Sequence, residues 1–154
     1  MEYFLLGQHF VNNEIGEPFN GQPTSKESRL ARYVEQSLEA LRTGCFTYFA
    51  HPDLLNFTGD PAVYDKWMRK LCEETKKEDI SLEINFLGIW DKRHYPNPVF
   101  WKIAGEVGNK VIFGADAHQP EKVWNPAALK KAEGMVKTYG LCRLDTVNLV
   151  SPKK

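Results

Sequence analysis

The sequence repeatedly alternates short apolar runs with longer segments whose apolar residues recur at helical spacing, and this pattern constrains the fold more than any other feature. Five runs have the length and composition of strands: Tyr3–Phe10, Cys45–Ala50, Ser81–Phe86, Lys110–Phe113 and Leu141–Val147. Strands that alternate with helices form βαβ units with parallel strands and right-handed crossovers. The sequence therefore predicts an α/β fold with about five parallel strands.

The segments between these runs are expected to be helices. In the first, Leu30, Val34, Leu38 and Leu41 make one apolar stripe, Thr24 with Glu27 fits a capping box, and Gly44 stands where a C-terminal cap belongs. Further helices are expected around residues 64–71, 99–107 and 129–139. A chain of 154 residues is long enough for one sizeable core. We expect a single domain over residues 1–154.

Charge and composition argue against several classes of partner. Lys plus Arg and Asp plus Glu both number 20, so no overall field attracts nucleic acid or an anionic membrane. The aromatic residues Trp67, Phe100, Trp101 and Trp124 lack an accompanying basic stripe and are interpreted as core packing. No segment has the length to span a bilayer, and the N-terminus lacks the features of a secretory signal. Three scattered cysteines without a CxxC pair fit a reducing cytoplasm.

Histidines and an aspartate follow the predicted strands at their carboxyl ends. His9 follows the first strand, His51 the second, and Asp116 with His118 the fourth. A lone histidine at a strand end is more often a structural residue than a ligand. The carboxyl ends of parallel strands lie on one side of the molecule, however, and imidazole with carboxylate suits zinc, iron or manganese. The joint pattern predicts a divalent-metal site made by these four residues.

Asp116 and the polar residues of the third strand each admit two interpretations. Asp116 either points into the cleft with His118 or caps the following helix, and the nearby Gly114 favours the first. In the third strand, Glu83 and Asn85 alternate with apolar residues. These two polar residues either face a ligand or belong to an edge strand exposed to water.

The loop after the third strand offers groups that can bind phosphate. Arg93 has a planar guanidinium that suits a phosphate dianion, and His94 stands beside it. Lys92 is a weaker candidate. The alternative is a solvated charged loop with no ligand.

Five segments together resemble the successive motifs of one known family. They are LLGQHF (Leu5–Phe10), FAHPDL (Phe49–Leu54), LEINFLG (Leu82–Gly88), RHYPNPVFWKIA (Arg93–Ala104) and VIFGADAHQP (Val111–Pro120). The chain resembles the polymerase and histidinol phosphatase (PHP) superfamily, most closely its histidinol-phosphate phosphatases. The resemblance implies a distorted, TIM-like seven-stranded βα barrel with two or three metal ions. It implies that His9 and His51 bind one ion, Asp116 a second and His118 a third.

The same resemblance implies hydrolysis of a small phosphorylated substrate, L-histidinol phosphate, in histidine biosynthesis. A metal-bound hydroxide would be the nucleophile without a further catalytic side chain, and Arg93, His94, Glu83 and Asn85 would bind the substrate. The family's N-terminal HxH motif has no counterpart in the sequence, and about five strands are expected rather than seven. The chain is thus expected to be the C-terminal portion of a PHP barrel.

Two alternatives to an active phosphatase follow from the same residues. One is a catalytically incomplete PHP fragment that binds metal and forms a homodimer, or recruits the missing N-terminal half-barrel, to cover its sheet edges and apolar face. The other is a small doubly wound phosphate-binding domain, although a Gly-rich loop is lacking.

Overall fold

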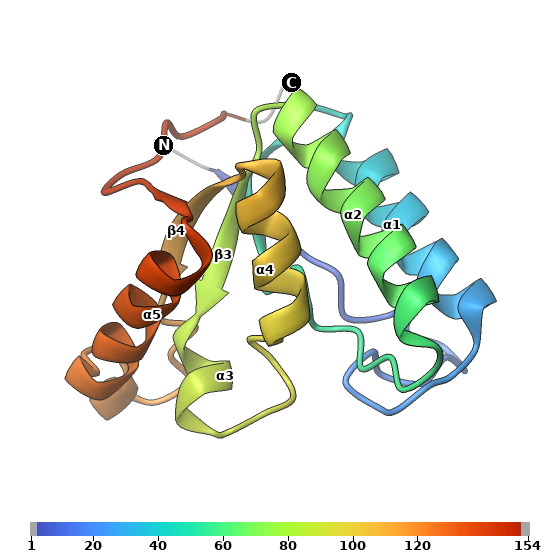
Figure 1. The fold of residues 1–154 in the computed structure, drawn as a ribbon, viewed down its shortest axis with the longest axis horizontal. Coiled ribbons are helices and arrows are strands. Elements are labelled where there is room, and N and C mark those ends of the chain that lie inside the picture. The colour runs from blue at the N-terminus through green and yellow to red at the C-terminus, as the bar shows by residue number, and fades with distance from the viewer. Residues whose placement is uncertain (1–2, 152–154) are drawn as a thin grey trace.

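The computed structural model describes residues 3–151 and confirms the α/β class. Five parallel strands form one sheet and alternate with helices along the chain (Figure 1). The strands are β1 (Phe4–Gly7), β2 (Phe46–Ala50), β3 (Ser81–Asn85), β4 (Lys110–Gly114) and β5 (Cys142–Arg143). The helices are α1 (Glu27–Leu41), α2 (Pro61–Lys77), α3 (Phe86–Trp90), α4 (Pro98–Val107), the 3-10 turn η1 (Pro120–Lys122) and α5 (Pro126–Tyr139).

The strand order in the sheet is the order in the sequence, from β1 to β5. Helices α1, α2, α4 and α5 lie on one side of the sheet, as right-handed crossovers between sequential neighbours require (Figure 1). This arrangement is consistent with part of a βα barrel. It excludes the doubly wound alternative, in which the strand order reverses and helices cover both faces.

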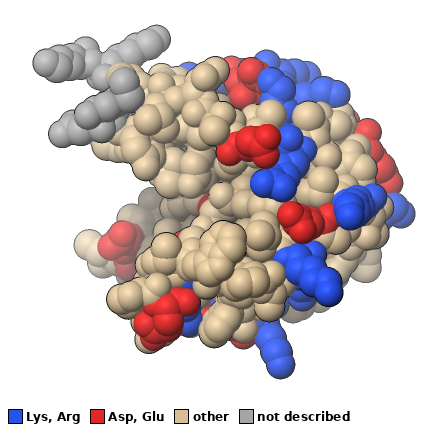
Figure 2. All heavy atoms as spheres, turned by 90° about the vertical axis from the view of Figure 1, so that its left-hand side faces the viewer, with Lys and Arg blue, Asp and Glu red and all other residues tan. Residues whose placement is uncertain are grey.

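Among the described residues, no helix covers the other face of the sheet, which is called the open face below. Pairing of Glu83 with Ile112 and of Tyr48 with Ser81 places Tyr48, Glu83 and Ile112 on this face, since side chains alternate along a strand. The space-filling view shows a hollow on the side of the molecule opposite the helices, with charges of both signs interspersed elsewhere (Figure 2). The open face therefore has the position of a barrel interior.

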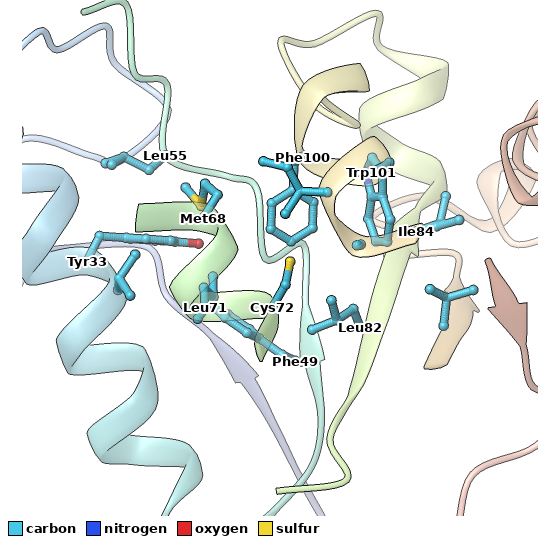
Figure 3. Close-up of a cluster of buried hydrophobic side chains, with 14 of the residues drawn as sticks. Tyr33, Phe49, Leu55, Met68, Leu71, Cys72, Leu82, Ile84, Phe100 and Trp101 are labelled. Atoms are coloured by element: carbon cyan, nitrogen blue, oxygen red, sulfur yellow. The ribbon is translucent and has the colours of Figure 1, made fainter. Parts of the chain in front are cut away.

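The core fills the space between the sheet and the helices (Figure 3). Phe49, Leu82 and Ile84 project from the sheet and are fully buried against α2 and α4. The predicted packing role of Phe100 and Trp101 is confirmed, because both are completely buried. The same prediction is wrong for Trp124, which is 72% exposed because it lies on the connection between β4 and α5 rather than on a helix face.

Several element boundaries differ from the prediction. The capping box is wrong: α1 begins after Lys26, and the backbone of Thr24 is held earlier in the loop by hydrogen bonds with Asn56 and Thr58. The C-cap is Arg42, and Gly44 turns the chain two residues later with φ +68°. β1 and β5 are shorter than predicted, and α3 and η1 are too short to produce a periodic pattern. Within residues 3–151, no helix has both the length and the apolar character needed to cross a bilayer.

Candidate functional site

A cleft of about 510 Å³ lies at the carboxyl ends of the strands, where the sequence places the candidate ligands. His9, His51, Asp116 and His118 all contribute to its wall, and so does Arg93. The remaining lining residues are Phe19, Leu54, Leu87, Asp91, Tyr95, Gln119 and Lys122. The structure thus brings all four predicted metal ligands to one cleft.

His9 and His51 form the centre of this site. They come from the ends of the neighbouring strands β1 and β2, and their ring centroids lie 4.9 Å apart. Gly7 makes this approach possible, because a Cβ atom there would lie 2.9 Å from Cε1 of His9 and 3.5 Å from Cε1 of His51. His51 has φ +35°, a conformation that non-glycine residues adopt mainly where the surroundings impose it.

The environment of His51 is that of a neutral imidazole available to a ligand. Burial, reinforced by the neighbouring His9, lowers the pKa of His51 to about 4. Its Nδ1 atom is buried and has no hydrogen-bond partner among the described residues. Because buried polar atoms are nearly always hydrogen-bonded, an unpartnered imidazole nitrogen at a cleft indicates a place for a bound group.

Glu83 and Asn85, both on β3, form hydrogen bonds with residues of the cleft wall. Glu83 Oε2 accepts a hydrogen bond from the backbone N–H of His51 at 3.2 Å. The Nδ2 amide of Asn85 donates to Glu83 Oε1 at 3.3 Å and to Asp116 Oδ2 at 3.1 Å. The interpretation of β3 as an edge strand is wrong, because β3 pairs with both β2 and β4. Glu83 and Asn85 are buried and outside the cleft lining, so the contacts place them behind its wall.

Glu83 is a buried carboxyl group close to a second carboxylate. Only 3% of the residue is exposed, and burial together with the nearby Asp116 raises the pKa of Glu83 to about 8. Gly114 gives its side chain room, since a Cβ atom there would lie only 1.8 Å from Glu83 Oε1. The Glu83 carboxyl is therefore mostly protonated near neutral pH when no cation is bound.

Asp116 and His118 follow β4, and Asp116 does not cap a helix. The N-caps of η1 and α5 are Gln119 and Asn125, so the capping interpretation of Asp116 is wrong. Asp116 has φ +46° and receives the Asn85 hydrogen bond. The imidazole of His118 is largely exposed, and its Nδ1 lies 2.9 Å from the Asp116 carbonyl oxygen. The Asp116 side chain is less exposed than that of His118, and its charge acts on the His51 imidazole.

A group of charged residues adjoins the histidine pair. Arg93 contacts Asp91 at 3.0 Å, and Lys122 contacts the other carboxylate oxygen of Asp91 at 3.0 Å. Arg93 also donates to the Tyr95 hydroxyl at 2.9 Å. Sequence reasoning identified Arg93 with the adjacent Tyr95 but missed Asp91 and Lys122. Lys122 lies on η1, and no local motif marks it.

The other candidates from the loop before α4 lie away from the cleft wall. His94 Nε2 is 2.7 Å from the backbone carbonyl oxygen of Leu54, and its ring packs edge-on against Tyr95. Neither His94 nor Lys92 belongs to the cleft lining, and Lys92 is exposed. These contacts favour a role for His94 in holding the loop rather than in binding substrate.

The described residues offer two adjacent imidazoles as candidate metal ligands but no ready-made metal centre. Over residues 3–151, no group of three or more His, Cys, Asp or Glu side chains is arranged to hold a metal ion. The two adjacent imidazoles and the unpartnered Nδ1 of His51 nevertheless offer two nitrogen ligands, and the Asp116 carboxylate lies on the same cleft wall. Two imidazoles and a carboxylate are a common ligand set for zinc, manganese and iron.

Comparison with known proteins adds no assignment. A scan against protein-family models and a search of curated proteins each found no match. The residues of the cleft are therefore the basis for a proposed function.

Proposed function

We propose that the protein is a metal-dependent phosphomonoester hydrolase of the PHP type, with L-histidinol phosphate as the first substrate to test. One observation carries the proposal. The ring centroids of His9 and His51 lie 4.9 Å apart in a cleft whose wall also includes Asp116 and Arg93. The candidate metal ligands and the candidate phosphate-binding cation thus line one cavity.

In this proposal, His9, His51 and Asp116 hold a divalent zinc, manganese or iron ion, with His118 as a further ligand at the rim. When bound, the ion would act as a Lewis acid toward a phosphoryl oxygen and provide a nucleophile at neutral pH. Two or three ions, as in PHP phosphatases, would require ligands beyond those that the described residues bring together.

The protein's own side chains have three tasks. Arg93, oriented by the Tyr95 hydroxyl, donates hydrogen bonds to phosphoryl oxygens. Asn85 fixes the Asp116 carboxylate, and Glu83 fixes the backbone of His51. Because the contacts place Glu83 and Asn85 behind the wall, they position other groups rather than touch the substrate.

Metal binding and hydrolysis can be tested separately. Zinc or manganese should bind chelator-treated protein in a calorimetric titration and release protons near pH 7, because a cation favours the ionised form of Glu83, whose pKa is raised to about 8 by burial and by Asp116. His51→Ala should weaken metal binding at least about tenfold. His94→Gln is the matched control, because His94 lies outside the cleft lining and should leave metal affinity unchanged.

Hydrolysis of L-histidinol phosphate by the metal-loaded protein is then measured by phosphate release. Turnover that requires metal and is lost in His51→Ala is the expected result. Metal binding without turnover of any phosphomonoester would refute the hydrolase.

A second candidate is a metal-binding half-barrel that turns over nothing by itself and pairs with a second copy or with a separate half-barrel. The open sheet face and the lack of a three-residue metal group within residues 3–151 favour it. Metal binding without hydrolysis, combined with dimerisation in sedimentation experiments, is its expected signature.

The cytoplasm is the proposed compartment. All three cysteines, Cys45, Cys72 and Cys142, are free thiols, which supports a reducing environment.

A further inference from the structure

The Asp91 carboxylate is shared between two cations inside the cleft. Its Oδ1 atom lies 3.0 Å from Lys122 Nζ, and its Oδ2 atom lies 3.0 Å from the Arg93 guanidinium. Lys122 comes from η1 and Arg93 from the loop after α3, so this contact joins two sides of the cleft. The Lys122 side chain is only 18% exposed, which makes it more confined than an ordinary surface lysine.

Each oxygen of the Asp91 carboxylate contacts a different cation. The carboxylate therefore serves as a guide to the kind of ligand that the two cations can bind. Arg93 and Lys122 together present donors to an anionic group that has two or more oxygens on one central atom. We propose that Arg93 and Lys122 form a subsite for a dianionic phosphoryl or phosphonate group, and that Asp91 occupies this subsite as an internal competitor when no ligand is bound. The role of this subsite in catalysis rests on the proposed function. The inference adds Lys122 as a second phosphate-binding cation and Asp91 as the group that the phosphate displaces.

The competitor makes the subsite selective for charge. The two cations carry two positive charges, and Asp91 neutralises one of them. A monoanionic ligand can only exchange one negative charge for another, and it must compete with a carboxylate that is tethered to the site at high effective concentration. A dianion gains a second ionic interaction when it displaces Asp91. Dianions should therefore bind, and monoanions of the same shape should largely be excluded.

The position of the subsite matches this role. Arg93 donates to the hydroxyl of Tyr95, and the Tyr95 ring lies 6.1 Å from the His51 ring between centroids. An anion on Arg93 and Lys122 would thus lie next to the histidine pair. Lys131 on α5 is a matched control, because it is exposed and lies outside the cleft lining.

The test uses phenylphosphonate and benzenesulfonate, which have similar shapes but carry two and one negative charges near pH 8. Binding of each to the chelator-treated chain of 154 residues is measured by calorimetry or ligand-observed NMR. The wild type should bind phenylphosphonate at least about tenfold more tightly than benzenesulfonate. Lys122→Met should weaken phenylphosphonate binding by about tenfold, and Lys131→Met should leave it unchanged. Lys122→Arg should restore part of the affinity.

Asp91→Asn is the decisive variant, because it removes the competitor and keeps the shape of the side chain. It should raise the affinity for both anions and raise that for benzenesulfonate more, so that the discrimination shrinks. Unchanged or weaker binding in Asp91→Asn, or unchanged binding in Lys122→Met, would overturn the inference, with thermal melting confirming that each variant is folded. The binding test is done without metal and is therefore independent of hydrolysis. If the protein prefers phenylphosphonate as expected but the metal-loaded protein hydrolyses no phosphomonoester, the proposed function is refuted and the subsite is not.

Discussion

Glu83 provides the sharpest prediction, because its environment has a measurable consequence for stability that requires no ligand. The pKa of Glu83 rises from 4.5 to about 8, mainly through burial and then through Asp116. A carboxyl group whose pKa is raised on folding contributes stability at low pH and loses it as pH rises through the folded-state pKa. We therefore expect the metal-free protein to become less stable from pH 6.5 to pH 8.

This pH range isolates Glu83 from the other buried groups. Burial lowers the pKa of His51 from 6.5 to about 4, so the stability from His51 is complete above pH 6.5 and is lost only as pH falls below that value. Burial raises the pKa of Asp53 to about 6, so its stability is mostly lost by pH 6.5. Each pH unit at which unfolding releases one proton costs about 1.4 kcal/mol, which gives a loss of about 2 kcal/mol between pH 6.5 and pH 8.

The assay is urea unfolding in the presence of a chelator at both pH values. With an m-value on the order of 2 kcal/mol per molar urea, the wild-type midpoint should fall by about 1 M. Glu83→Gln keeps the size of the side chain but cannot ionise, so its midpoint should hardly change with pH. Glu35→Gln removes one carboxylate from the exposed surface of α1 and should keep the wild-type slope. A flat wild-type profile, or a slope that persists in Glu83→Gln, would refute the reasoning.

Two further predictions concern packing. Gly105→Ala should destabilise the protein by about 2 kcal/mol or more in thermal or urea unfolding, because its Cβ atom would lie 1.8 Å from the backbone oxygen of Tyr139; Gly134→Ala, with nothing within 4 Å, should instead stabilise α5 by about 0.5–1 kcal/mol. Equal effects of the two substitutions would contradict the close contact of α4 and α5. Trp101→Phe should lower the free energy of unfolding by about 2–4 kcal/mol, because it removes the 3.0 Å hydrogen bond from Nε1 to Asp53 and leaves a buried gap. A loss below about 1 kcal/mol would show that this hydrogen bond contributes little.

The parts of the fold and site that follow regular patterns could be predicted from the sequence. Strand-length apolar runs alternate with amphipathic helices, and parallel strands all end on one side. The convergence of His9 and His51 follows from that rule without any knowledge of loop conformation. The polar residues of β3 were equally predictable as a pattern, but only the pairing of β3 with two neighbours decides that Glu83 is buried rather than exposed.

The parts that depend on short irregular segments could not be predicted. Asp91 and Lys122 are 31 residues apart in the sequence and meet because α3 and η1, both too short for a periodic signal, set their positions. His94 has the residue type of a ligand, but its hydrogen bond with the Leu54 carbonyl depends on the path of the loop before α4. Residue type alone therefore did not distinguish residues that line the cleft, such as Lys122, from residues outside it, such as His94.

The sequential order of the strands also bears on how such a protein can change over time. Three of the βα units each place a polar residue of the cleft after their own strand: His9 after β1, His51 after β2, and Asp116 after β4. The side chains that stabilise the fold lie between the sheet and the helices, away from these ends. Substitutions in a single loop can therefore alter what the cleft accepts while folding is left largely intact, so that new specificities are accessible one unit at a time.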